Sequence, residues 1–472
     1  MLPIMALAFY IAFIPHQIYP YPIHVDEWVH LALSKAMLQS SSTTIIDPFF
    51  GAGTRGLSSN LEAGFHLFWG VFHQISGISW PDIFRYFPGI IFVITVLSVY
   101  VLAQREGFGW EAALFTCLIP TTVGILGPAF LVPVALGLLF MPLALFLAFN
   151  FRSGWTYFVL FVFTSFLLSI HAPSAICVVI VLIPYILLNL KGNFKHSLGI
   201  TLAVLIPFLA PFPWIFNMLL PTAKKLLTPE ALPTFVDFPR IIKTYGYLPV
   251  LLCLLGTFLL VIRGGKKNYS FTFGLLALGV MVGTYFTFHY GLHIVYTRGL
   301  MYTLLMVSVM AGAGLAGVKN LSLPTGLTAR LKVPSIITQN LGKFLCLVLV
   351  GVILALGIPD RQETPYYHMI DEEDYRAFVW VRENVDKDYA KAILDPWKAT
   401  AFSAITGKSI YTRIHAYPEP KDKEAREFLV GGCSDTAFLR KNNISIVYTR
   451  RECQNPDLTE VRQNIYLLKK GE

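Results

Sequence analysis

The chain of 472 residues is 55% hydrophobic and only 14% charged, and its net charge is +9. A soluble globular protein of this length seldom has so few charges, so the composition excludes a soluble enzyme and predicts that lipid surrounds most of the chain. The positive charge would favour nucleic acid as a partner in a soluble protein, but here the basic residues sort between loops, and no nucleic-acid partner is expected.

Apolar stretches of about 17 to 25 residues recur along the chain, as helices that cross a hydrocarbon core of roughly 30 Å require. The run over 111–149 is interrupted by prolines and a glycine, which leaves a re-entrant pair open as the alternative there. We predict a polytopic all-α membrane domain of about eleven spanning helices. They lie near 3–20, 83–103, 111–126, 129–149, 154–170, 173–190, 197–219, 246–262, 269–288, 298–317 and 343–358.

The basic residues between these spans indicate the topology. They fall in every second loop, and the positive-inside bias puts those loops in the cytoplasm. We therefore expect an integral protein of the plasma membrane of a prokaryote, with a cytoplasmic N-terminus and an external C-terminal segment. The residues concerned are Arg105, Arg152, Lys191, Lys195, Arg263, Lys266, Lys267, Lys319, Arg330 and Lys332.

The first external segment, 21–82, has two stretches of helical periodicity, at 26–38 and 61–75. Both are too short and too polar to span a bilayer, so each predicts an amphipathic helix at the membrane surface. The stretch between them, 40–60, is rich in Ser, Thr and Gly and predicts a flexible loop over a bound substrate.

The sequence HVDEWVH at 24–30 places two adjacent carboxylates directly after the first span. Burial near lipid and mutual repulsion would raise the pKa of at least one of Asp26 and Glu27, which suits a general base. Acidic residues are equally typical of the first turn of a helix, so a purely structural role stays open.

A metal site is a further alternative in the same segment. Glu27 and His30 are three residues apart, Asp26 and His30 four, and Glu62 and His66 repeat the spacing of four on the second helix. Such pairs share a helical face and offer ligands to a divalent metal, but they also arise often by chance. A divalent metal cofactor is therefore left open.

Basic residues on the external side suggest an anionic ligand. The loop 220–245 contains Lys224, Lys225 and Arg240, with an ordinary solvated loop as the alternative. The segment 289–298 collects His289, His293, Tyr296 and Arg298. An arginine at the edge of lipid needs a partner and binds phosphate through two hydrogen bonds, whereas contact with lipid headgroups or a protein carboxylate is the alternative.

The segment 359–472 alternates helical and strand patterns and predicts a small C-terminal α/β domain with a mostly parallel sheet. Strands are expected at 391–395, 408–412, 443–449 and 464–469, and helices at 371–385, 397–406, 421–430 and 434–442. Cys433 and Cys453 lie in this domain, and both a disulfide and two free thiols remain open. The predicted domains are thus 1–358 and 359–472.

These features together resemble the GT-C superfamily of membrane glycosyltransferases, which includes protein O-mannosyltransferases, oligosaccharyltransferases and aminoarabinose transferases. The resemblance covers most of the chain. It is carried by Asp26-Glu27 followed by a surface helix, by 61–89, by Arg298 leading into a Gly-rich helix, and by 374–413. Asp-Glu replaces the Asp-x-Asp of oligosaccharyltransferases, and Asp395-Pro396-Trp397 stands where they have Trp-Trp-Asp, so transfer to asparagine is not implied.

The resemblance implies an inverting transfer from a polyprenyl-phosphate-linked sugar to a glycan, lipid or protein acceptor on the external side. Asp26 would be the base, and Glu27 would hold the acceptor or the base. Arg298 is the first candidate to bind the lipid phosphate, and Lys224, Lys225 and Arg240 are further candidates. His24, His30, His289, His293 and Tyr296 would line the pocket. Trp397 and Tyr411 would stack on the acceptor, with an external domain that only caps the active site as the alternative.

A transporter or flippase of lipid-linked saccharides is the chief alternative from another functional class, followed by a non-catalytic membrane assembly factor. None of the predicted spans carries an Asp or Glu in its middle. Ion-coupled transporters commonly place ionisable residues near the midplane, so this absence favours the enzyme.

Overall fold

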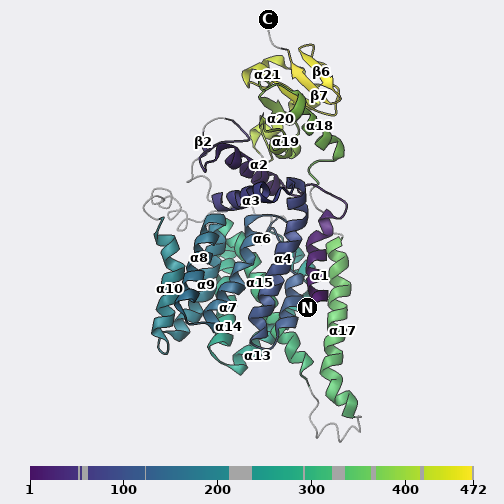
Figure 1. The fold of residues 1–472 in the computed structure, drawn as a ribbon. Helices are drawn as coiled ribbons and strands as arrows, with labels where there is room; N and C mark the ends of the chain where they lie inside the picture. Colours follow the sequence, from purple (N-terminus) through teal and green to yellow (C-terminus); the bar gives the residue numbers. More distant parts are fainter. Residues whose placement is uncertain are drawn as a thin grey trace. The chain divides into compact units, whose positions relative to one another are not determined.

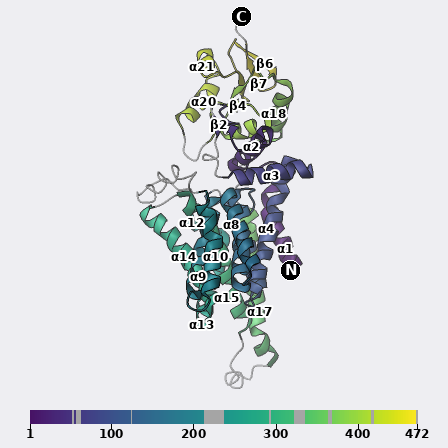
Figure 2. The same ribbon diagram turned by 60° about the vertical axis from the view of Figure 1, so that its left-hand side comes forward.

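The computed structural model describes residues 1–469, apart from 52–53, 56–61, 123, 212–235, 291–292, 322–334, 363–367 and 415–418. The chain forms two compact units. Residues 1–17 and 86–365 make up one, called the helical unit here, and residues 18–85 and 366–472 make up the other, called the mixed unit. Figures 1 and 2 show the two units from two directions.

The helical unit is built from apolar helices. Six described helices are long and apolar enough to cross a membrane, and α12 and α13, bent by 82° against each other, add a seventh if they form one span. The predicted count of about eleven is therefore not confirmed. The helices are α1 (Leu2–Phe13), α4 (Trp80–Gln104), α5 (Gly109–Cys117), α6 (Pro133–Leu138), α7 (Phe140–Asn150), α8 (Gly154–Ile170), α9 (Ala172–Asn189), α10 (Phe194–Leu209), α12 (Phe238–Tyr245), α13 (Tyr247–Arg263), α14 (Lys266–Phe288), α15 (His293–Lys319) and α17 (Ser335–Gln362), with a 3-10 turn at Ile14–His16.

The predicted spanning helix at 111–126 is not found. Helix α5 ends at Cys117, and in the described part of the segment no helix begins again before Pro133. Prolines at 120 and 128 explain the break, since proline has no N–H to donate within a helix and its ring clashes with the preceding turn. One long apolar run therefore divides into separate short helices.

Helix α15 lies in the interior of the helical unit, whereas α17 lies at its periphery. Within the apolar window of α15, 78% of the residues are buried, against 11% in α17. Glycines bring α13 and α15 into close contact, because a Cβ on Gly256 would lie 1.8 Å from the Met310 carbonyl oxygen and one on Gly314 would lie 2.0 Å from that of Leu252. Small residues at such contacts are typical of packed membrane helices.

The mixed unit combines the segment after the first helix with the C-terminal domain. The first segment contributes α2 (Val25–Ser40), β1 (Ile45–Ile46), β2 (Thr54–Arg55) and α3 (Ala63–Ser76). The C-terminal segment contributes α18 (Glu372–Asn384), β3 (Lys391–Ile393), α19 (Pro396–Thr406), β4 (Ser409–Ile410), α20 (Pro420–Val430), α21 (Thr436–Lys441), β5 (Ile446–Tyr448), β6 (Leu458–Arg462) and β7 (Ile465–Leu468).

The C-terminal sheet has the order β4-β3-β5-β7-β6. Strands β4, β3 and β5 are parallel, with Ala392 opposite Ile446, and β7 and β6 add an antiparallel hairpin. The sheet is thus mixed, and β6 was not predicted. Cys433 and Cys453 form a disulfide across 20 residues beside its core.

The first segment is anchored to the C-terminal domain by hydrogen bonds within the mixed unit. Lys35 Nζ on α2 donates to the carbonyl of Ala404 on α19 at 2.8 Å, and Ser403 Oγ donates to the carbonyl of Pro48 at 2.6 Å. The Tyr19 hydroxyl donates to the carbonyl of Ile370 at 2.7 Å. Segments more than 350 residues apart therefore fold as one body.

Candidate functional site

Helix α2 begins with a capping box formed by the HVDE sequence. His24 has an extended backbone, and its Nδ1 accepts a hydrogen bond from the Asp26 amide at 3.1 Å. Glu27 is fully buried, and its Oε2 accepts from the amides of Ile23 and His24 at 2.8 and 3.2 Å. These reciprocal bonds satisfy amides that have no partner inside the helix. The structural role expected for an acid at this position is therefore found for Glu27.

Asp26, the neighbouring acid, stays accessible. Its side chain is 37% exposed, and its Oδ2 lies 3.8 Å from Nδ1 of His24. The two adjacent acids thus differ in environment, since Glu27 is buried in the helix cap and Asp26 is partly exposed.

One turn further along α2, His30 meets the start of α3. Its Nδ1 lies 3.0 Å from Nε2 of His66 and 3.9 Å from Oε2 of Glu62. His30 is 6% exposed and His66 is fully buried. One potential ligand atom from each residue lies within 4.8 Å of the other two, an arrangement that can hold a metal ion. The structure thus joins His30 to the Glu62 and His66 pair and leaves Glu27 in the helix cap.

The described residues among the predicted phosphate-binding set belong to the helical unit. His289 ends α14 in a left-handed conformation, and His293 begins α15. Tyr296 stacks on Tyr285 with ring centroids 4.5 Å apart, and Arg298 lies half-buried one half-turn later. Arg240 is exposed on α12, whereas the predicted residues Lys224 and Lys225 lie outside the described part of the chain.

Trp397 and Tyr411, the predicted stacking residues, differ in accessibility. Trp397 is 39% exposed in the first turn of α19, and its amide donates to Asp395 Oδ1 at 3.1 Å. Tyr411 is only 4% exposed and packs against Phe438 in the core, with its hydroxyl bonded to Glu424. The prediction that Tyr411 stacks on a ligand was therefore wrong, because its ring is part of the hydrophobic core.

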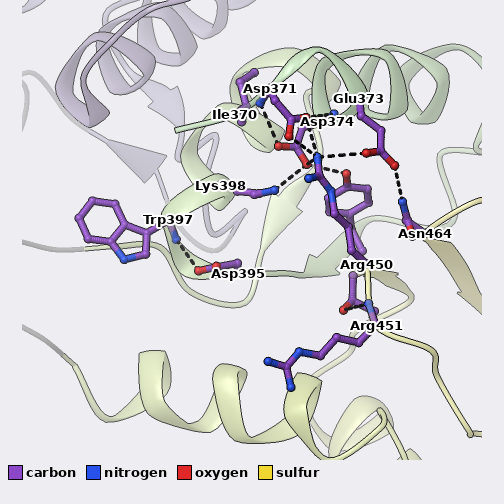
Figure 3. A network of polar contacts seen from close by, with 12 residues as sticks. Ile370, Asp371, Glu373, Asp374, Asp395, Trp397, Lys398, Arg450, Arg451 and Asn464 are labelled. Atoms are coloured by element: carbon purple, nitrogen blue, oxygen red, sulfur yellow. Dashed lines mark hydrogen bonds and ion pairs between the residues drawn. The ribbon is translucent and has the colours of Figure 1, made fainter. Parts of the chain in front are cut away.

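A polar network in the C-terminal domain was missed by the sequence analysis (Figure 3). Arg450, directly after β5, bonds to Asp371 at 2.5 Å and lies 3.0 Å from Asp374. Asp374 has only 1% of its side chain exposed, and it also accepts from Lys398 at 2.7 Å and from Tyr448 at 2.6 Å. The acidic run at 371–374 gave a helix-start signal, but nothing in the sequence indicated its basic partners.

Electrostatics fix the charge states in this network. Burial by itself would raise the pKa of Asp371, but hydrogen bonds from Arg450 and the Asp374 amide outweigh it and lower the pKa from 3.8 to about 2. The hydrogen bond to Asp371 in turn raises the pKa of Arg450. Asp371 and Arg450 therefore both stay ionised at neutral pH, and their contact ties α18 to the end of β5.

The mixed unit also contains a cavity of about 920 Å³ between α2 and α19. Its lining mixes cations, hydroxyls and an acid with the indole of Trp80, on which His73 stacks with ring centroids 4.6 Å apart. Such a mixture suits a polar ligand that has an apolar face. Residues of the lining include Lys35, Gln39, Asp47, Trp80, Arg382 and Thr406.

Comparison with known proteins supports the resemblance at the level of fold. No family model matches the chain, and no curated protein matches its sequence. The oligosaccharyltransferase of Archaeoglobus fulgidus in the apo form matches with a TM-score of 0.64 at 11% identity, over 95% of this chain and 69% of the other.

Two further structures agree with this match. The same oligosaccharyltransferase in complex with zinc and sulfate has a TM-score of 0.59 at 12% identity, over 94% of this chain and 67% of the other. The arabinofuranosyltransferase AftD from Mycobacteria has a TM-score of 0.58 at 15% identity, over 97% of this chain and 37% of the other. The chain therefore shares its fold with these two glycosyltransferases.

Proposed function

We propose that the chain is a membrane glycosyltransferase that moves a sugar from a polyprenyl-phosphate-linked donor to an acceptor on the non-cytoplasmic side of a prokaryotic plasma membrane. The observation that carries this proposal is an accessible carboxylate, Asp26, in the first turn of a helix that directly follows the first apolar helix of a GT-C fold. The exposure of this side chain contrasts with that of Glu27, which is fully buried.

Asp26 is the general base in this proposal. The acceptor hydroxyl gives its proton to the Asp26 carboxylate while its oxygen attacks the anomeric carbon of the donor. The bond from that carbon to the phosphate oxygen breaks on the opposite face, so the lipid phosphate leaves and the configuration inverts. Glu27 is a positioning residue, because its capping bonds fix the turn that carries Asp26.

The donor phosphate gains negative charge as it leaves, so cations held in place around it accelerate the transfer. We assign this role to Arg298, with Arg240, Lys224 and Lys225 as further candidates. His289, His293 and Tyr296 precede Arg298 in the same segment and are the pocket residues we propose beside it. Arginine suits phosphate because its planar guanidinium offers two parallel donors.

We assign the acceptor to the mixed unit. The cavity of about 920 Å³ offers hydroxyl, amide and charged groups for sugar hydroxyls and the Trp80 ring for an apolar sugar face. This chemistry favours a glycan acceptor over a lipid or a peptide. Trp397 is a second, exposed ring for stacking, and His24 lies beside the base.

The test uses purified protein in detergent and in sealed vesicles, with a panel of radiolabelled polyprenyl-phosphate sugars and glycan acceptors. We expect one label to leave the lipid and enter the acceptor only when protein is present. A protein that moves the labelled lipid across the vesicle membrane, without releasing the sugar from it, would instead be a flippase. That result would overturn the proposal.

A further inference from the structure

We propose that His30, Glu62 and His66 form a zinc-binding site between α2 and α3. The site is separate from the general base and does not depend on the proposed glycosyl transfer. The types of the three side chains, the distances between their ligand atoms and their burial support it.

The residue types fit zinc better than the hard cations. Two imidazole nitrogens and one carboxylate oxygen form a ligand set that zinc accepts, and three protein ligands leave a fourth position for water or another group. Magnesium and calcium prefer sites built from oxygen atoms alone. The two histidines therefore select a borderline-soft divalent ion.

The distances fit as well. Ligand atoms bound tetrahedrally to zinc lie about 3.4 Å apart, since each zinc–ligand bond is about 2.1 Å long. The His30 Nδ1 to His66 Nε2 distance is 3.0 Å, and the His30 Nδ1 to Glu62 Oε2 distance is 3.9 Å. Both differ from the ideal value by about 0.6 Å or less, which small side-chain rotations can absorb.

The surroundings hold the three groups in place. Glu62 is the residue that precedes α3, and the His66 amide bonds to its carbonyl at 3.2 Å, so both side chains lie on the same turn. The Phe65 ring lies 5.0 Å from the His30 ring and shields it from water. Leu33, Met37 and Ala63 pack in the apolar contact between α2 and α3. A metal here bridges helices that already pack together.

The burial of the site adds to the argument from geometry. His30 is 6% exposed and His66 is fully buried, so an ion held between them would be shielded from bulk water. It would also fix the helix α2 that carries Asp26 one turn earlier.

The binding test starts from purified full-length protein that has been dialysed against a chelator. Zinc chloride is added, and bound zinc is counted by mass spectrometry after gel filtration. Cobalt replaces zinc in a parallel sample, because a tetrahedral cobalt site gives a characteristic visible absorption spectrum. We expect about one zinc per chain and that spectrum for the wild type. A wild-type protein that retains no zinc would overturn the proposal.

Variants identify the ligands. We expect His66→Ala and Glu62→Gln each to weaken zinc binding at least about tenfold and to abolish the cobalt spectrum. The matched control is His73→Gln, two turns further along the same helix, which should bind zinc like the wild type. Unchanged binding in Glu62→Gln, a variant that keeps the side-chain shape, would contradict the site even if His66→Ala failed to fold. Without a metal role, the two histidines would simply share a hydrogen bond.

Discussion

Nη2 of Arg450 donates hydrogen bonds to both carboxylate oxygens of Asp371, at 2.5 and 2.6 Å. The same guanidinium lies 3.0 Å from the buried carboxylate of Asp374. One side chain at the end of β5 therefore neutralises two acids at the start of α18 (Figure 3). This relationship makes the C-terminal domain dependent on a contact between segments nearly 80 residues apart.

Replacing Arg450 should destabilise the mixed unit. Arg450→Met leaves Asp371 without its cation and Asp374 with fewer donors, so we expect a loss of about 2 kcal/mol in the free energy of unfolding. The control is Lys423→Met, which removes an exposed pair with Glu427 and should change stability by less than about 0.5 kcal/mol. Thermal or denaturant unfolding in detergent compares the two. Equal effects of both substitutions would contradict the prediction.

The same contact predicts an acid-dependent stability. The pKa of Asp371 is lower in the folded state, at about 2, than its ordinary value of 3.8. The unfolded state therefore binds a proton first, and the stabilisation is complete above pH 3.8 and disappears as the pH falls to about 2. Unfolding measured against pH should show this loss in the wild type and a smaller one in Arg450→Met. The same slope in both proteins would refute the assignment.

The buried amine of Lys35 predicts a second pH dependence, at alkaline pH. Burial, and then repulsion by Arg382, lower its pKa from 10.5 to about 8. Between these values the unfolded state holds a proton that the folded state has lost, so stability should rise with pH. Lys35→Met removes this titrating group together with its hydrogen bond to Ala404, so its free energy of unfolding should rise less between pH 8 and 10.5 than that of the wild type. The exposed control Lys387→Met should keep the rise of the wild type, and the same rise in Lys35→Met would contradict the assignment.

The disulfide between Cys433 and Cys453 should stabilise the C-terminal domain. It closes a loop of about 20 residues, for which restriction of the unfolded chain contributes about 3 kcal/mol. Cys453→Ser should therefore lower the unfolding temperature, and a reducing agent should lower that of the wild type but not that of the variant. Cys346→Ser removes a thiol outside this pair and serves as the control. A wild type insensitive to reduction would indicate that the pair is dispensable.

Local patterns in the sequence predicted the local elements well. The apolar spacing at 26–38 and 61–75 corresponds to α2 and α3, and the alternation after residue 370 corresponds to α18, β3, α19 and the following elements. The span predicted at 111–126 was not found, because the hydropathy of a segment does not show where a proline ends a helix. Strand β6 was missed because most of its residues are exposed, so its apolar signal is weak.

The groupings of residues could not be predicted in the same way. His30 and His66 are 36 residues apart, and Asp371 and Arg450 are 79 apart, so only tertiary packing brings them together. The spacing rules joined Glu62 with His66, but they joined His30 with Asp26 and Glu27 because these residues share its helix. The difference between Asp26 and Glu27 was likewise invisible, since a capping box depends on the backbone before the helix.

The most direct test of the account is the initial rate of sugar transfer in matched carboxylate variants, measured with the donor and acceptor that the panel identifies. Asp26→Asn keeps the size of the side chain and removes the base, so we expect transfer to fall by at least about a hundredfold. Glu27→Gln should lose stability through its weakened cap and keep more activity than Asp26→Asn. Asp82→Asn, an exposed acid in the first turn of α4, should transfer at the wild-type rate. A folded Asp26→Asn protein that transfers sugar as fast as Asp82→Asn would rule out Asp26 as the general base.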